Sequence, residues 1–424
     1  MKEDLLQYIW QFQYFNTKEL QTANGEEIQI ISPGSHNSNQ GPDFRDGKIK
    51  IGNTMWAGNI ELHISSSDWN LHRHSSDNNF SNIILHVVWN HDADIKDANQ
   101  NNIPTLELQQ RVSKLLLNKY RELMASAGFI PCERMVPQVN DLTITHWKQR
   151  LIAERMVAKA ERILCILKET NFHWEETFWR VIAYNFGLKV NSSPFQKIAE
   201  SLPVSVLAKH KHSIHHLEAL LFGQAQLLKE TFQDKYPVML QKEYQFYRKK
   251  YQLQEIDGEL FFLRMRPASF PTIRLAQLAM LIYNSEHLFS KIKEAHSVGE
   301  VRAMLDVKAN DYWNYHYIFD EETDYKEKNL GSQMINNIII NTVVPVLFAY
   351  GSHHDEKSHR EKAINWLENL TAEKNSITKG FEQLGLSNKN AFDSQALIQL
   401  KNEYCNKKFC LRCSIGNALL KRNL

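Results

Sequence analysis

The sequence predicts an α+β protein, with an α/β domain over residues 1–110 and a large all-α region over residues 111–424. Two observations support this division. Before residue 110, short runs that alternate apolar and polar residues are separated by turn residues, a pattern typical of β-strands. After that point, apolar residues recur at helical spacing almost to the end of the chain. With 424 residues, 43% of them hydrophobic, the chain is long enough for more than one hydrophobic core.

The first region is expected to begin with a helix and to continue with five strands. Leu5, Ile9 and Phe12 share one face of the helix. A short helix is expected between the third and fourth strands, in the segment SSDWNLHRHSSDNNFSN. The predicted strands, separated by turn signals, are EIQIIS, GKIKIG, GNIELHIS, NIILHVVW and IPTLELQ. The predicted order is therefore helix, three strands, short helix and two strands.

The second region is predicted from its helical periodicity and its helix start signals. Pro194 and Pro271 each stand at the first position of a predicted helix, where a missing N–H costs nothing. The longest apolar run, Met334 to Gly351, contains three Asn and Pro345, a composition that favours a buried helix over a membrane span. We expect no signal peptide and no membrane partner, and a cytoplasmic location, since five Cys without a secretory signal suit a reducing compartment.

Acidic residues mark the hairpin formed by the second and third predicted strands. Asp43 follows a Gly-Pro turn, and Glu61 lies in the middle of the neighbouring strand, beside His63 on the same face. Carboxylates that face each other across an antiparallel pair are suitable ligands for Mg²⁺ or Mn²⁺ in phosphodiester cleavage. We expect Asp43 and Glu61 to bind such an ion, with His63, Lys48 or Lys50 positioning water.

Histidines are concentrated in the same region, which holds six of the eighteen in the chain. His72, His74 and Asp77 follow the hairpin closely and are further candidate metal ligands. One alternative is a zinc hydrolase in which His63, His72 and His74 join one carboxylate. The other alternative is an exposed loop that is rich in histidine without any function.

The hairpin motif resembles that of a known enzyme superfamily. Pro42-Asp43, a turn and then Glu61-Leu62-His63 resemble the PD-(D/E)xK motif of the restriction-endonuclease-like nucleases, which lies on such a hairpin in an αβββαβ core. His63 stands where that motif has a lysine. The resemblance implies a metal-dependent nuclease acting on DNA or RNA, or a degenerate nuclease-like protein that binds nucleic acid. A zinc hydrolase on a small substrate and a non-enzymatic interaction scaffold are the alternatives.

A wider set of sequence phrases resembles a family of uncharacterised bacterial proteins. The phrases are GPDF, GNIELH, SSDW, ILHVVW, RPASFPTIRLAQLA and NTVVPVLFAYG, together with a C-terminal cysteine cluster. They span nearly the whole chain. The resemblance implies that these phrases belong to one architecture, and it supplies no activity.

Four cysteines form a candidate cofactor site. Cys405, Cys410 and Cys413 lie within nine residues, and Cys132 is the expected fourth ligand. Four thiolates suit either Zn²⁺ or a 4Fe-4S cluster, and the ligand count does not separate the two. The alternative is a group of reduced thiols packed at a helix end. Cys165, within a long amphipathic helix, is expected to be a core thiol.

Arginines beside aromatic residues mark a candidate nucleic-acid contact in the helical region. Arg264, Arg266 and Arg274 lie among phenylalanines in FFLRMRPASFPTIRLAQ, and such a combination suits phosphate and base contact. The alternative is that these arginines pair with acids while the phenylalanines fill the core. The net charge of +2 does not favour a protein that binds polyanions over its whole surface.

Overall fold

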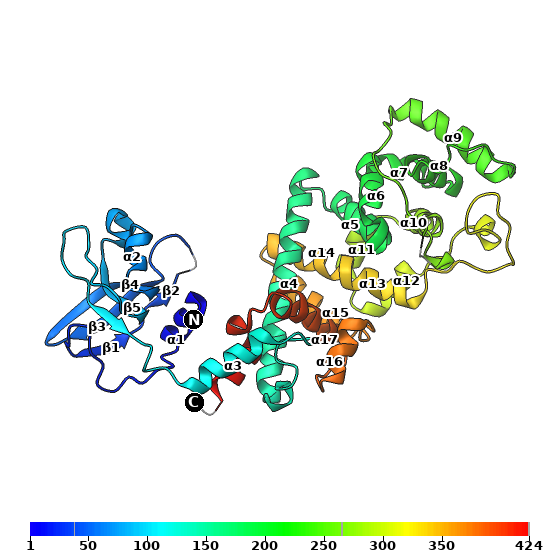
Figure 1. The fold of residues 1–424 in the computed structure, drawn as a ribbon. Helices are drawn as coiled ribbons and strands as arrows, with labels where there is room; N and C mark the ends of the chain where they lie inside the picture. The colour runs from blue at the N-terminus through cyan, green and yellow to red at the C-terminus, as the bar shows by residue number, and fades with distance from the viewer. Residues whose placement is uncertain (38, 264–265, 423–424) are drawn as a thin grey trace. The chain divides into compact units, whose positions relative to one another are not determined.

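The protein is a mixed α+β chain that divides into two compact units (Figure 1). The computed structural model describes residues 1–37, 39–263 and 266–422. Met1–Trp147 together with Leu400–Leu424 form the first unit, and Lys148–Gln399 form the second. The predicted α+β class is confirmed. The first unit extends past the predicted boundary at residue 110 and also takes in a segment from the far end of the sequence.

A six-stranded mixed sheet forms the framework of the first unit. Its strands are β1 (Ile28–Ser32), β2 (Ser35–His36), β3 (Phe44–Ile51), β4 (Thr54–Ser65), β5 (Ile83–Asn90) and β6 (Thr105–Glu107). The strand order is β1-β3-β4-β5-β6, and β2 pairs with the start of β3. β1, β3 and β4 run antiparallel, whereas β5 and β6 are parallel to β4. The hairpin of β3 and β4 is therefore central in the sheet.

The second half of β4 is buried on both of its faces. Ile60 and Leu62 lie in the hydrophobic core, and α1 (Glu3–Gln11) packs against the strand. Glu61 and His63 point the other way and are also buried, because the segment after β4 folds back over them. That segment begins with the short helix α2 (Asp68–Leu71). It is held down by a small hydrophobic cluster of Trp69, Phe80, Ile95 and Ile103.

Helices from both ends of the sequence complete the first unit. They are α3 (Lys114–Ala125), the beginning of α4 (Asp141–Glu169), which continues into the second unit, and α18 (Ser414–Lys421). α18, drawn in red in Figure 1, packs against α3. The Tyr8 hydroxyl on α1 donates a hydrogen bond to Asn417 Oδ1 at 2.5 Å. The N-terminal and C-terminal helices of the unit are thus in direct contact.

The second unit is built from helices. They are α5 (Trp174–Phe186), α6 (Leu188–Ser201), α7 (Val204–His210), α8 (Ile214–Gln224), α9 (Lys235–Tyr251), α10 (Pro271–Asn284), α11 (Leu288–Glu294), α12 (Val298–Leu305), α13 (Ser332–Ile338), α14 (Val344–His353), α15 (Lys357–Glu368), α16 (Ser376–Gln383) and α17 (Ala391–Gln399). A π-helical segment joins α13 to α14. The continuous helix Ser332–His353 is long and apolar enough to cross a membrane, and 72% of its most apolar window is buried inside the protein.

Candidate metal centre

The two predicted carboxylates meet at the end of the central hairpin. Asp43 immediately precedes β3, and its backbone N–H donates to Glu61 Oε2 at 3.0 Å. The Leu62 N–H donates in turn to Asp43 Oδ2 at 3.1 Å, and the Gln7 side chain on α1 donates to Asp43 Oδ1 at 2.8 Å. Both oxygens of Asp43 therefore already accept hydrogen bonds. Glu61 Oε1 instead faces the histidines of the segment that covers β4.

Two histidines lie near that oxygen of Glu61, and a third histidine lies beside one of them. Glu61 Oε1 lies 3.7 Å from His63 Nε2 and 3.6 Å from His74 Nε2. His63 Nε2 lies 3.1 Å from His72 Nδ1. Among the described residues, His63, His72 and His74 are the one set of three or more candidate ligands with all ligand atoms within 4.8 Å of one another. A tetrahedral zinc ion with bonds of about 2.0–2.1 Å separates its nitrogen ligands by about 3.3 Å, so this spacing fits a metal ion.

The backbone after β4 explains how neighbouring histidines reach one point. His72 caps the C-terminus of α2, and His74 opens a 3-10 turn over His74–Ser76. Between them, Arg73 is in the left-handed conformation, with φ 58° and ψ 33°. A residue other than glycine costs roughly 1–2 kcal/mol in this region. The conformation turns the chain sharply, so that residues 72 and 74 both direct a ring nitrogen toward His63.

His86 supports the central histidine from the neighbouring strand. It lies on β5, directly opposite Glu61 in the parallel register, and its side chain is fully buried. Its Nε2 lies 2.8 Å from His63 Nδ1. When His63 binds a metal through Nε2, its proton resides on Nδ1 and is donated to His86 Nε2, an arrangement that orients metal-binding histidines. His86 is therefore a hydrogen-bonded residue in an apolar strand.

Burial shifts the pKa values of two histidines and two carboxyl groups at this site. Burial lowers the pKa of His63 to about 3, and the neighbouring His74 and His72 lower it further. The pKa of His74 is also lowered, mainly by burial. Burial raises the pKa of Glu61 to about 9, assisted by Asp43, and burial raises the pKa of Asp43 to about 7. His63 and His74 are therefore neutral near pH 7, the form in which imidazole binds metals.

The two predicted lysines lie elsewhere on the hairpin. Lys48 pairs with Ala57 and Lys50 with Met55, at positions four and six residues before Glu61 on β4. At about 3.3 Å per residue, these positions are roughly 13 and 20 Å from Glu61 along the strand. Neither lysine is close enough to position water at Glu61, which corrects the expectation for both.

Asp77 serves the fold of the covering segment. Its Oδ1 accepts the backbone N–H of Asn79 at 2.9 Å and the Asn79 side-chain amide at 2.9 Å. It thereby caps the 3-10 turn Asn78–Phe80. Asp77 is not among the converging ligand atoms, in contrast to its predicted role as a metal ligand.

Two of the arginines predicted to contact nucleic acid, Arg266 and Arg274, lie in or beside the helices of the second unit. Arg266 is exposed, and Arg264 lies outside the described residues. Arg274 on α10 is only 8% exposed and donates to Gln277 Oε1 at 2.7 Å. Burial lowers the pKa of Arg274 to about 10. A side chain enclosed in this way cannot reach a phosphate backbone, so the expectation for Arg274 is wrong.

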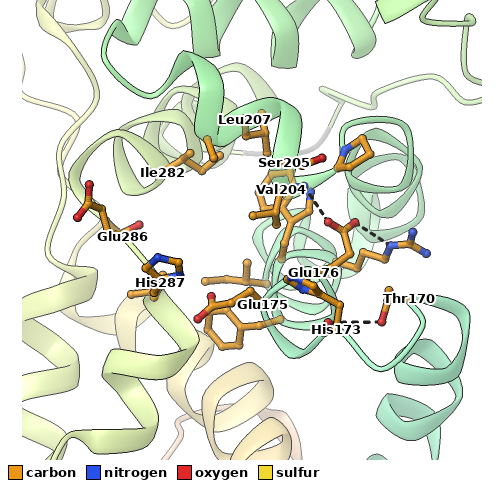
Figure 2. A pocket seen from close by; sticks show the side chains of 18 of the residues that line it. Thr170, His173, Glu175, Glu176, Val204, Ser205, Leu207, Ile282, Glu286 and His287 are labelled. Carbon is orange, nitrogen blue, oxygen red and sulfur yellow. Dashed lines mark hydrogen bonds and ion pairs between the residues drawn. The ribbon is translucent and has the colours of Figure 1, made fainter.

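A cavity of about 720 Å³ lies in the second unit, lined mainly by α5, α7 and α10 (Figure 2). Its acidic groups have structural partners. Glu176 accepts from Arg180 at 3.3 Å and from the Val204 backbone N–H at 2.7 Å, as the dashed lines in Figure 2 show. Glu175 accepts the backbone N–H groups of Phe289 and Ser290. These carboxylates hold helices together, whereas the converging ligand set lies in the first unit.

Comparison with known proteins identifies the family. The profile of a family described as "Protein of unknown function (DUF2851)" matches residues 3–376. The chain belongs to this family. The DUF2851 match includes the entire sheet and its histidines, and it ends before Cys405, Cys410 and Cys413. No curated protein and no solved structure matches this DUF2851 chain.

Proposed function

We propose that the sheet of the first unit is a metal-dependent hydrolase centre. In this proposal His63, His72 and His74 hold a transition-metal ion, and Glu61 is the base for a water molecule at the open fourth position. The single observation behind it is the convergence of three imidazole nitrogens, within 4.8 Å of one another, beside Glu61 Oε1. Three histidine ligands and one open position are typical of catalytic zinc.

The donor atoms favour zinc or manganese over magnesium. Mg²⁺ prefers oxygen ligands, and imidazole nitrogen suits zinc and other transition metals. The expected pair of carboxylate ligands is replaced by a set rich in nitrogen, because both oxygens of Asp43 accept other hydrogen bonds. Of the two metals expected for the acidic site, Mn²⁺ is therefore the better fit. Zn²⁺ fits the nitrogen set best.

The side chains around the ligands suit hydrolysis. A bound ion of this class lowers the pKa of water to near neutral and polarises the bond to be cleaved. Glu61 Oε1 is directed toward the ligand atoms. The charge of a bound cation would lower the raised pKa of Glu61, and the carboxylate could then accept the proton of an attacking water. The Asp43 N–H fixes the other oxygen of Glu61, so the carboxylate cannot rotate freely. His72 is exposed, which leaves the ligand set open to a substrate from that side.

We assign a phosphodiester in DNA or RNA as the first candidate substrate. The support is the hairpin with Pro42-Asp43 and Glu61-His63, which resembles the PD-(D/E)xK nucleases, and the order of helix, strands, short helix and strands. In this chain His63, at the position of the motif lysine, is a ligand. A small ester or phosphate ester is the second candidate, and the nitrogen-rich ligand set favours it.

Metal content tests the centre directly. Protein purified without a metal-affinity tag is expected to hold about one equivalent of zinc or manganese, measured by mass spectrometry. His72→Ala and His74→Ala should each lower that content strongly, because each removes one ligand. His91→Ala is the matched control, since His91 lies in the same unit and pairs with Asp94 at 3.5 Å. Equal metal content in all four proteins would refute the proposed ligands.

Substrate assays separate the candidate functions. The loaded protein is mixed with single-stranded and double-stranded DNA, with RNA, and with p-nitrophenyl esters of acetate and phosphate. Cleavage of nucleic acid that is lost in His74→Ala supports a nuclease. Cleavage of the small esters alone supports the small-substrate hydrolase. Full metal loading with no cleavage of any substrate would contradict the hydrolase proposal and favour an interaction scaffold.

A further inference from the structure

The C-terminal segment is tied to the turn that contains Cys132. The Lys401 ammonium donates to the Phe129 carbonyl oxygen at 2.6 Å and lies 4.7 Å from the centre of the Phe129 ring. The Lys408 ammonium donates to the Met124 carbonyl oxygen at 2.5 Å. These contacts hold residues 124–132 against residues 401–408, within the first unit. Cys132 is therefore close to cysteines from which it is separated by more than half of the sequence.

Four cysteines form one buried group. Each is free of disulfides and less than a tenth exposed: Cys132 at 7%, Cys405 at 9%, Cys410 at 6% and Cys413 at 6%. Cys165, by contrast, is exposed, so its predicted place in the core is wrong. Each of the six pairs within the group interacts electrostatically, so the four sulfurs are near one another, and burial raises the pKa of all four thiols.

Donor groups surround the sulfur atoms. The backbone N–H groups of Ile415 and Gly416, at the start of α18, and the side chain of Trp147 hydrogen-bond to the Cys413 sulfur. The ammonium groups of Lys401 and Lys408 interact electrostatically with Cys405 and Cys410. A neutral thiol gains little from such donors, whereas a metal-bound thiolate is stabilised by them.

The spacing of the sulfurs distinguishes two kinds of cofactor. In a tetrahedral zinc site with Zn–S bonds of about 2.3 Å, neighbouring sulfurs are about 3.8 Å apart. Among the described residues the histidine set is the one group of three or more ligand atoms compact enough for a single metal ion, so the cysteine sulfurs are spread more widely than the ligands of one ion. The ligand sulfurs of a four-iron cluster are about 6–7 Å apart, because they bind different irons. The wider arrangement suits a cluster.

We propose that Cys132, Cys405, Cys410 and Cys413 bind one 4Fe-4S cluster, each as a thiolate that has released its proton. Three ligands come from the segment of η7 (Leu400–Cys405), η8 (Cys410–Arg412) and the residue that precedes α18, and the fourth comes from the turn before α4. The cluster thus joins the two parts of the chain that make up the first unit. The proposal is independent of the hydrolase centre, which uses other residues and another metal.

The test is the iron and sulfide content of the full-length protein purified without oxygen. We expect about four irons and four acid-labile sulfides per chain, and a broad absorbance near about 400 nm that bleaches on reduction with dithionite. Stoichiometric zinc at the cysteines without iron would overturn the proposal. So would protein that contains neither metal and that takes up no iron when iron and sulfide are supplied under reducing conditions. These measurements use the unaltered protein, so they do not depend on whether a variant folds.

Variants then assign the ligands. Cys410→Ser and Cys132→Ser should each lower the iron content and the absorbance, and Cys165→Ser, which changes the exposed thiol, should leave both unchanged. Iron that persists in full in Cys132→Ser and Cys410→Ser would refute the assignment. His74→Ala should retain all of its iron while losing the zinc or manganese of the histidine set. The experiments therefore test the cysteine site and the histidine site separately, and one proposal can be refuted without the other.

Discussion

Each unit of the protein buries a glutamate, and the hydrogen-bond partners of the two glutamates differ. In the second unit, Glu218 is fully buried on α8, and both of its oxygens accept hydrogen bonds. Tyr236 donates to Oε2 at 2.5 Å, and Asn310 and Trp313 donate to Oε1 at 2.5 and 3.1 Å. In the first unit, Glu61 accepts one backbone N–H on Oε2, and its Oε1 faces imidazole nitrogens at 3.6 Å or more.

The difference shows that a shifted pKa alone does not mark a functional site. Burial raises the pKa of Glu218 to about 8 and that of Glu61 to about 9. The two glutamates differ in the hydrogen-bond donors that surround them. The donors around Glu218 use up its lone pairs, as in a structural network. Around Glu61, the Oε1 oxygen and the imidazole nitrogens face one another with too few N–H or O–H groups to satisfy their lone pairs. Such an arrangement is typical of a cation-binding site.

The largest expected effect comes from neutralising the glutamate of the first unit. Glu61→Gln removes the proposed base, so we expect cleavage to fall about 10²–10⁴-fold. The melting temperature should stay nearly the same, because the amide is uncharged like the protonated carboxyl of Glu61 and still accepts the Asp43 N–H. Steady-state kinetics and thermal melts measure the two effects. Glu218→Gln is the control, and a matching loss of activity there would undo the comparison.

A smaller effect is expected from pH at the glutamate of the second unit. The pKa of Glu218 rises from its ordinary value of 4.5 to about 8 on folding, so folding favours the protonated form. Its contribution to stability is complete below the unfolded pKa and is lost as the pH rises through the folded pKa. The free energy of unfolding of the second unit should therefore decrease between about pH 5 and pH 8, by up to a few kcal/mol at about 1.4 kcal/mol per pKa unit.

Urea unfolding at several pH values measures this loss. Glu218→Gln has no proton to lose, so its unfolding free energy should vary less over the same range. The difference between the two proteins isolates Glu218 from other groups that titrate there, such as Asp43, whose pKa is about 7. Identical pH dependence in the two proteins would mean that Glu218 is already ionised in the folded state.

The smallest expected effect concerns the residue behind the metal ligands. His86→Phe removes the acceptor for His63 Nδ1 while filling the same buried space beside Trp69. Loss of such a partner typically weakens metal binding about 10–100-fold. Competition with a zinc indicator measures the affinity. His86→Gln restores a hydrogen-bonding oxygen and should recover part of it, whereas a purely packing role for His86 would make Phe the better replacement.

The sequence predicts much of the hairpin but not what covers it. The alternation around Glu61 and His63 is enough to place both side chains on one face, as found. It cannot reveal that both are buried, because their cover depends on the turn at Arg73. A left-handed residue at that position has no sequence signal, since glycine or asparagine is the usual choice. His72 and His74 could thus be proposed as ligands, but their convergence could not be derived.

Other differences between the sequence predictions and the structure arise from contacts between residues that are far apart in the sequence. Gln7 binds Asp43 from a helix 36 residues away in sequence, and no local pattern indicates such a pair. Lys48 and Lys50 are adjacent to Asp43 in sequence but lie along the strand, away from Glu61, because pairing between β3 and β4 fixes their place. Arg274 has the composition of a phosphate contact, and only the packing around α10 reveals its burial. The inclusion of Leu400–Leu424 in the first unit is likewise a long-range feature.

The first unit is built from two separate segments of the chain, and this affects the order in which the units can fold during synthesis. The ribosome makes residues 1–147 before the helices of the second unit, and it makes the segment from Leu400 after them. The second unit can therefore pack while the first still lacks α18 and the contact between Tyr8 and Asn417. A nascent chain would hold its sheet without α18 until the segment from Leu400 has been made. Folding of the first unit is thus coupled to the synthesis of that segment.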